Sequence, residues 1–296
     1  MRLLLAACAA VALSTSVSAQ HHPEGDDNDL AHVHDTAAFI EHHGEEVAAA
    51  LAKENREADR ARDQYRHPAE TLAFFHIGPH MKVGEYAPGG GWYSRVLGNY
   101  LNGEGRLVGL WRSADGAALD EAGRTSLRNG AAAFAARMAE WTGRPDTGAV
   151  GYTLDAVPEA ERGTFDRLLL IRMLHNMVDD GIAESELSRM HSLLKPGGML
   201  GVVQHRAKAN APDDYADGSK GYLRQADVVA LVESQGFELV GKSEINANPA
   251  DPANWEGGVW TLPPGYRGAP EGSARRAELD KVGESDRMTL LFRKRK

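Results

Sequence analysis

The stretch VGEYAPGGGWYS, from Val83 to Ser94, constrains the fold of this chain more than any other part of the sequence. Apolar residues and one acid lead into three consecutive glycines, and two aromatic residues follow. Glycine has no Cβ, so its backbone can turn sharply and approach a ligand closely. A helix that begins after such a turn offers free N–H groups to polar or anionic groups. The stretch predicts a strand, a ligand-binding loop and a helix, and it indicates a nucleotide-like cofactor.

The rest of the chain continues the alternation of strand and helix. "FDRLLLIRML" is an uninterrupted apolar run, typical of a central parallel strand that is buried on both faces. Helices are predicted at Trp92–Leu101, Gly130–Trp141, Glu184–Leu194 and Ala226–Gln235, and the other strands are Met81 to Tyr86, "RLVGLW", "AVGYTL", "MLGVVQHR", "FELVGKSEI" and "RMTLLFRK". This order predicts a doubly wound α/β sheet whose ligands lie beyond the carboxyl ends of the strands.

The first nineteen residues predict a cleavable signal peptide. Arg2 precedes an apolar core (residues 3–13), and Ala19 ends a small-residue cleavage site. Residues 5–8 also resemble a lipoprotein cleavage box, but only seven residues precede Cys8. Cleavage after Ala19 would make the mature protein periplasmic or secreted, and it would remove the only cysteine.

Residues 20–46 predict a solvated, flexible tail. They hold six of the twelve histidines, interleaved with acids. His-rich tracts can bind zinc or copper, but these spacings match no closed tetrahedral set, so no metal site is predicted. A charged segment from Glu45 to Tyr65 has opposite charges at helical spacing and predicts a surface helix. The main domain is expected to span residues 47–296.

The composition excludes some classes of partner. The net charge is −9 and no basic stripe is present, which argues against nucleic acid as a substrate. No apolar run after the signal peptide reaches the ~20 residues of a membrane span. These features favour a small-molecule substrate and leave the oligomeric state open.

The order of motifs resembles the class I S-adenosylmethionine-dependent methyltransferases, and more narrowly a group of exported predicted methyltransferases of unknown substrate. The resemblance covers about residues 65–296. It rests on the glycine stretch, on "FDRLLLIRMLHNM", on the turn and strand "LLKPGGMLGVVQHR", and on two C-terminal strands separated by an insertion. It implies a Rossmann-like, seven-stranded sheet with a terminal antiparallel strand pair, and S-adenosylmethionine as the cofactor.

The resemblance also implies which residues hold that cofactor. Glu85 is the acid of the first strand, and the small residues of the loop form the cradle: Ala87, Gly89, Gly90 and Gly91. Asp155 lies where the family has an acid that contacts the adenine. A helix N-cap is an equal alternative for Asp155.

The sequence departs from the family pattern after the second strand. An acid that binds the ribose is expected near Leu110 or Trp111, and neither residue is one. Trp111 is predicted to stack on the adenine, with a core position at a strand end as the alternative. Asp115 is another acid that could reach the ribose.

Two histidines end the fourth and fifth strands and are the predicted catalytic residues. Methyl transfer is an in-line displacement that depends on positioning, with a general base where the acceptor holds a proton. His175 and His205 can take a proton near neutral pH. Their neighbours Asn176 and Arg206 are predicted to bind the substrate, Arg206 through an anionic group. The alternative is that both imidazoles are structural.

The long segment between the last two strands, residues 247–285, predicts a cap over the substrate pocket. Loops of this length in compact domains are often lids or binding loops. Its tryptophans need something to pack on, and Trp260 is predicted to contact the substrate. The alternative is a purely structural extension.

Three functions are compatible with the sequence. The first is S-adenosylmethionine-dependent methyl transfer to an unidentified small molecule. The second is a non-catalytic binding protein on the same scaffold, favoured by the missing ribose acid and by the export signal. The third is an NAD-dependent oxidoreductase. It fits less well because the dinucleotide-binding fingerprint requires an acid about 20 residues beyond the glycines, and Trp111 occupies that position.

Overall fold

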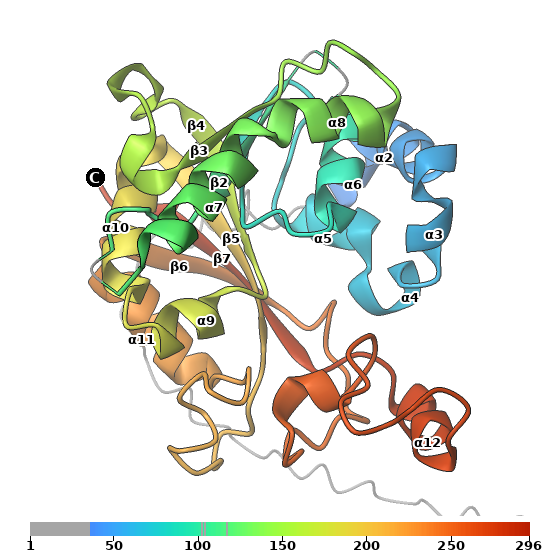
Figure 1. Cartoon of the computed structure of the whole chain (residues 1–296). Helices are drawn as coiled ribbons and strands as arrows, with labels where there is room; N and C mark the ends of the chain where they lie inside the picture. Colours follow the sequence, from blue (N-terminus) through green and yellow to red (C-terminus); the bar gives the residue numbers. More distant parts are fainter. Residues whose placement is uncertain (1–35, 102, 104, 117) are drawn as a thin grey trace, which may run out of the picture.

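The computed structural model describes residues 36–101, 103, 105–116 and 118–296. The predicted signal peptide and residues 20–35 lie outside the described residues. Strands and helices alternate along the chain (Figure 1). The helices are α2 (Thr36–Leu51), α3 (Glu57–Arg60), α4 (Asp63–Arg66), α5 (Pro68–Phe74), α6 (Trp92–Leu101), α7 (Glu121–Ala132), α8 (Phe134–Thr142), α9 (Leu174–Asp179), α10 (Ala183–Leu193), α11 (Gln225–Ser234) and α12 (Ala274–Val282).

One seven-stranded sheet forms the centre of the molecule, in the order β3-β2-β1-β4-β5-β7-β6. β7 is antiparallel to both of its neighbours, whereas the pairs among the first five strands are parallel. This α/β sheet with a reversed last strand is typical of the methyltransferase Rossmann-like fold and confirms the predicted fold class. The strands are β1 (Lys82–Tyr86), β2 (Arg106–Trp111), β3 (Val150–Thr153), β4 (Phe165–Ile171), β5 (Leu194–His205), β6 (Phe237–Ser243) and β7 (Arg287–Lys294).

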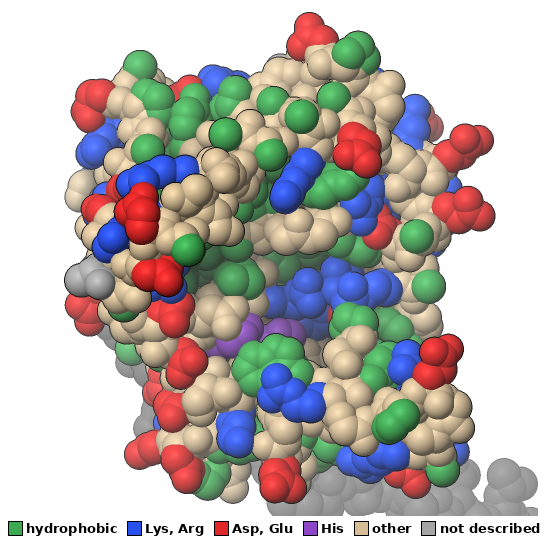
Figure 2. Space-filling model, viewed as in Figure 1, with side chains coloured by type: hydrophobic (Ala, Val, Ile, Leu, Met, Phe, Trp, Pro, Cys, Tyr) green, Lys and Arg blue, Asp and Glu red, His purple; other side chains and the backbone are tan. Residues whose placement is uncertain are grey.

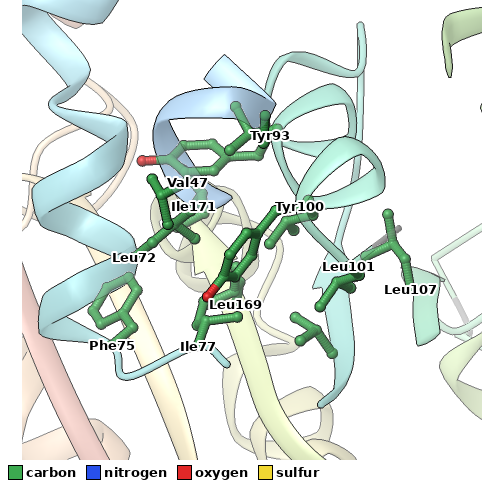
Figure 3. Packing of buried hydrophobic residues seen from close by; sticks show 14 of the residues in the cluster. Val47, Leu72, Phe75, Ile77, Tyr93, Tyr100, Leu101, Leu107, Leu169 and Ile171 are labelled. Carbon is green, nitrogen blue, oxygen red and sulfur yellow. The ribbon is translucent and has the colours of Figure 1, made fainter. Parts of the chain in front are cut away.

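Helices cover both faces of the sheet because successive residues of its strands point to opposite sides. In β4, Leu169 and Ile171 join the core under α2, α5, α6 and α8, and Figure 3 shows that packing. Leu168 and Leu170 join a second core under α10 and α11. The uninterrupted apolar run of β4 is therefore buried on both faces, as its sequence predicts.

The helix predicted at residues 130–141 is instead the end of α7 followed by α8, which meet at Ala133. α7 begins earlier because the Asp120 side chain accepts a hydrogen bond from the Gly123 N–H and caps the helix. Most of α7 is polar, with Ala131 buried, so its apolar pattern did not show its start. None of the described helices is both long and apolar enough to cross a membrane.

The N-terminal helices belong to the domain, which corrects two predictions. α2 begins at Thr36, inside the predicted tail, and Phe39 and Val47 on its inner face are buried in the core. The charged segment after it forms short turns and helices rather than one surface helix. Arg56 is fully buried there because it forms a double hydrogen bond to Asp63 and lies over the ring of Trp92.

The segment between β6 and β7 folds into a compact unit beyond the carboxyl ends of the strands (Figure 1). It contains a short 3-10 helix (Gly258–Thr261) and α12, and it takes part in two small apolar clusters, one around Tyr222 and one around Leu262. Its three aromatic side chains have packing partners, since Trp255, Trp260 and Tyr266 contact these clusters.

Candidate active site

A cavity of about 450 Å³ lies at the carboxyl ends of β1, β4 and β5. This volume is in the range of small-molecule sites, about 300–1,000 Å³. Five parts of the chain line it: the α3–α4 region, the end of β1 with the loop and the start of α6 after it, the residues after β4, His205 at the end of β5, and the turn at residues 259–265 together with Glu284 and Ser285. Figure 2 shows the hollow between the upper body of the molecule and the C-terminal unit. The position agrees with the rule that α/β sheets bind ligands at the strand ends.

The glycine loop after β1 presents bare backbone to this cavity. Gly89 has a φ of +57°, and a Cβ built on Gly90 would meet nothing within 4 Å. Ala87 also has a positive φ, and its N–H donates to the carbonyl of Leu110 at 2.7 Å. Gly91 has a different role, because a Cβ there would lie 2.5 Å from the ring of Trp141. Ala87, Gly89 and Gly90 line the cavity, and Gly91 lets the loop pack on α8.

Glu85, predicted beside the cradle, is a buried acid in the cavity wall. Its side chain accepts a hydrogen bond from the Ser94 hydroxyl at 2.6 Å. Burial raises the pKa of Glu85 to about 8, although the Ser94 hydrogen bond and the charge of Arg95 oppose the shift. The carboxyl is therefore protonated at neutral pH and adds no negative charge to the cavity.

The two histidines lie side by side in the cavity wall, with ring centroids 5.5 Å apart. The amide N–H₂ of Gln204 donates to the carbonyls of Gly221 and His205, which directs its Oε1 to Nδ1 of His175 at 3.3 Å. An amide oxygen only accepts, so Nδ1 of His175 carries the proton and Nε2 keeps its lone pair. Nδ1 of His205 is 2.5 Å from the Ser285 hydroxyl.

Both imidazoles are neutral at physiological pH. Burial lowers the pKa of His175, which the hydrogen bond to Gln204 partly offsets. The pKa of His205 is lowered well below its ordinary value, first by burial and then because a proton on its ring would be repelled by a protonated His175 and by nearby arginines such as Arg172. A neutral imidazole with a free ring nitrogen can accept a proton.

Two of the three predicted substrate-binding residues line the cavity, and the third does not. Asn176 and Trp260 line the cavity, and the Trp260 ring lies edge-on to His175 at 6.0 Å. Arg206 does not line it, because two carboxylates occupy its guanidinium: Asp286 at 3.0 Å and Glu244 at 2.7 Å. The expectation that Arg206 binds an anionic group of the substrate was therefore wrong. Its pairing with these carboxylates instead ties β5 to the chain around β6 and β7.

The residues predicted beyond β2 and β3 lie outside the cavity. Trp111 packs edge-on against Phe134 and lines a separate surface depression beside α7. Asp155 accepts a hydrogen bond from the N–H of Ala114 at 2.8 Å, and Asp115 pairs with Arg189. None of the described residues between 106 and 165 lines the cavity. Trp111 therefore packs against the edge of the core, close to its alternative position. Asp155 lies in a 3-10 helix (Leu154–Ala156) and holds the N–H of Ala114 rather than capping a helix.

Sequence reasoning missed a group of arginines in the cavity. Arg62 and Arg66 come from the α3–α4 region, and Arg172 directly follows β4. Glu284, just ahead of β7, accepts hydrogen bonds from both Arg62 and Arg66. The signal for Arg172 was its place at a strand end, three residues before His175. Nothing in the sequence marked Arg66 as a neighbour of that strand end.

S-adenosylmethionine, which the resemblance implies, fits one end of this site. The open space over Gly89 and Gly90 suits a ligand that lies against bare backbone. The nucleoside end lacks its expected partners, because Trp111 and Asp155 are engaged elsewhere. Within the described part of the chain, no group of three or more His, Cys, Asp or Glu residues could hold a metal ion.

No protein-family model matches the chain, and neither does any curated protein. Among solved structures it is similar to a SAM-dependent methyltransferase from Aquifex aeolicus (14% identity, TM-score 0.47, 72% of this chain and 93% of the other). It is also similar to a Burkholderia thailandensis 1,6-didemethyltoxoflavin-N1-methyltransferase with bound 1,6-didemethyltoxoflavin and S-adenosylhomocysteine (14%, 0.44, 94% and 94%). The cyclase SpnF is comparably similar (16%, 0.46, 78% and 80%). Identities this low do not establish a shared activity.

Proposed function

We propose that this protein transfers the methyl group of S-adenosylmethionine to a small-molecule acceptor. The observation that carries the proposal is the cavity itself. In it, a bare glycine loop at the end of β1 lies in the same wall as two neutral histidines, His175 in the first turn of α9 after β4 and His205 at the end of β5. The reversed β7 supports a methyltransferase-like sheet over the classical dinucleotide-binding sheet, which disfavours an oxidoreductase.

The residues of the chain would contribute positioning and proton removal. S-adenosylmethionine, when bound, supplies a methyl group on a sulfonium. Gly89 and Gly90 would hold its aminoacyl end against the loop, and Trp260 would close the opposite side of the cavity. Nε2 of His175 would accept the proton of the acceptor, while Gln204 holds the ring in the tautomer that leaves this nitrogen free.

A direct experiment tests the proposal. The purified chain is titrated with S-adenosylmethionine, S-adenosylhomocysteine and NAD by calorimetry, and then incubated with S-adenosylmethionine carrying a labelled methyl group and a panel of small molecules. Binding of the first two ligands without NAD, followed by label transfer, is the expected result. Binding of neither sulfur ligand by a folded chain would refute the proposal.

A second candidate is a ligand-binding protein that has lost catalysis. The positions of Trp111 and Asp155 favour it, because they leave the nucleoside end of the cofactor without its expected side chains. Binding of small molecules without S-adenosylmethionine binding or label transfer would support this candidate.

We also propose that the protein is exported after cleavage following Ala19. This proposal depends only on the sequence of residues 1–19. Mass spectrometry of the protein from its native host should find Gln20 at the N-terminus. An intact Met1 in a cytosolic fraction would refute it.

A further inference from the structure

The cavity contains more positive charge than its own carboxylates neutralise. Glu284 accepts hydrogen bonds from Arg62 at 2.6 Å, Arg66 at 3.2 Å and Arg287 at 3.1 Å, so three guanidinium groups share one carboxylate. Arg172 is a fourth cation nearby, and no ion pair among the described residues involves it. Figure 2 shows blue Lys and Arg side chains inside the hollow, next to the purple histidines.

The other acids of the cavity do not offset this charge. Asp59 is engaged by Arg95, whose Nε and Nη2 lie 2.5 and 2.7 Å from its oxygens. Glu85 is protonated at neutral pH because its pKa is about 8. Arg62, Arg66 and Arg172 line the cavity, and Arg287 contacts Glu284 from outside the lining. These four guanidinium groups thus share one ionised carboxylate, which leaves three excess positive charges in and beside the cavity.

Several of these guanidinium nitrogens also lack a partner within the part of the chain that the structure describes. Nη1 and Nη2 of Arg66 are buried and make no hydrogen bond there, although the side chain is only 1% exposed. Nε of Arg172 and Nη2 of Arg62 are likewise buried and have no hydrogen-bond partner among the described residues. Leaving a buried charged donor unsatisfied costs free energy, so such donors are expected where a ligand supplies the acceptor.

The backbone and the acid–base properties of Arg172 also indicate a ligand site. Its φ is +59°, a strained conformation for a residue other than glycine, and such strain concentrates at binding sites. Burial, together with the charges of Arg66 and Arg287, lowers the pKa of Arg172 to about 9. An anion placed beside these groups would relieve both the burial cost and the mutual repulsion.

We propose that Arg66 and Arg172 bind an oxyanion, a carboxylate or a phosphate, on the methyl acceptor, beside His175 and His205. The assignment of this anion to the acceptor depends on the proposed methyl transfer. S-adenosylmethionine carries a carboxylate too, but its ammonium and sulfonium give it a net positive charge. A site with three excess positive charges is therefore balanced by an acceptor that brings negative charge.

Inorganic phosphate is the probe for the test, titrated by calorimetry at low salt into the full chain without cofactor. We expect phosphate to bind wild type, and Arg172→Gln to weaken it by about tenfold or more, with a smaller loss in Arg172→Lys, which keeps the charge. Arg162→Gln removes an exposed charge outside the cavity lining and should leave the affinity unchanged. Equal phosphate affinity in wild type and Arg172→Gln would overturn the proposal.

Thermal melting separates ligand binding from a structural role. Arg172 pairs with no carboxylate of the described chain, so Arg172→Gln should melt at the same temperature as wild type or higher without ligand, because an unpaired buried charge is removed. A variant that melts earlier and loses phosphate binding would show a structural role and contradict the proposal.

A second titration identifies the source of the anion. Phosphate that still binds to the chain saturated with S-adenosylhomocysteine supports the acceptor, whereas competition between the two ligands assigns the arginines to the carboxylate of the cofactor and overturns it. A chain that binds phosphate but no sulfur ligand would refute the methyl transfer, and with it the assignment to a methyl acceptor, while the anion site itself remains. A chain that binds the sulfur ligands but no phosphate would refute the anion site alone.

Discussion

The carboxyl ends of β1, β4 and β5 and the carboxyl ends of β2 and β3 belong to one sheet but present different surfaces. The first group opens into the cavity with bare glycines, two neutral histidines and guanidinium nitrogens that have no hydrogen-bond partner among the described residues. The second group is closed, because Trp111 packs on Phe134 and Asp155 holds the N–H of Ala114. The adjoining acid Glu186 is also engaged, with the N–H of Ser113 at 3.2 Å.

This difference indicates which half of the site a ligand can use. Several polar groups in the first region lack partners among the described residues, so a ligand that pairs with them gains free energy. Asp155 and Glu186 in the second region have partners within the chain, so a ligand there would have to break existing hydrogen bonds. The chemistry of the protein is therefore expected to depend on the first region, while the second supports the loops.

The largest expected effect is on catalysis at His175. We expect His175→Asn to lower the rate of methyl transfer by about 10²–10⁴-fold, the usual loss of a general base. Asparagine keeps a side-chain N–H that can donate to Gln204, but it has no counterpart of Nε2. Turnover of the labelled methyl group, affinity for S-adenosylhomocysteine and melting temperature are measured together.

His191→Asn is the matched control for this variant. His191 packs edge-on against Phe237 and is not among the residues that line the cavity. Its variant should keep normal turnover. Normal turnover in folded His175→Asn as well would mean that His175 is structural, and the first region would lose its catalytic role.

A large effect on stability is expected from Glu85 as the pH changes. The folded chain keeps the proton of Glu85 up to a pKa of about 8, whereas the unfolded chain releases it near the ordinary glutamate pKa of 4.5. Unfolding therefore releases a proton between these values, and stability falls as the pH rises, by up to about 1.4 kcal/mol per unit. Above about pH 8 this loss is complete.

Glu85→Gln should remove this pH dependence, since an amide has no proton to release. Urea unfolding of both proteins at several pH values between 5 and 9 gives the comparison, with Glu140→Gln on the exposed side of α8 as the charge control. Parallel stability curves for wild type and Glu85→Gln would show that Glu85 ionises freely and that the cavity holds less net positive charge.

Most of the fold could be predicted from the sequence because its signals are local. The apolar run of β4 and the glycine loop after β1 each mark their own element. The predicted start of the domain was wrong because a run of polar residues and one glycine, residues 41–46, separates Phe39 from the apolar end of α2. The start of α7 was missed because most of that helix is polar and its first turn depends on the Asp120 cap.

The site was predicted less well because its contacts join distant parts of the chain. His175 and His205 were identified by their places at strand ends, and they do lie together. Arg206 has an equivalent place, but the carboxylates that pair with it lie just after β6 and just before β7, which no local pattern reveals. Arg66 reaches the cavity only through tertiary packing.

A moderate effect is expected on cofactor binding at Gly90. Gly90→Val places a branched side chain in the open space over the loop, at a residue without positive φ. We expect affinity for S-adenosylhomocysteine to fall by about tenfold or more, or about 1.4 kcal/mol. Gly78→Val, in the turn before β1 and away from the cavity lining, is the control. Unchanged affinity for S-adenosylhomocysteine in folded Gly90→Val would show that the cofactor does not bind at this loop.

The smallest expected effect on binding is at Asp155, in the second region. Asp155→Ala removes the acceptor of the Ala114 N–H, so stability should fall by about 1–3 kcal/mol, seen as a lower melting temperature. Affinity for S-adenosylhomocysteine should stay within about threefold, because Asp155 does not line the cavity and residues that share no partner act independently of one another. The two readouts separate the alternatives that the sequence left open. If affinity instead drops tenfold while the melting temperature holds, Asp155 touches the ligand, and the contrast between the two ends of the sheet is wrong.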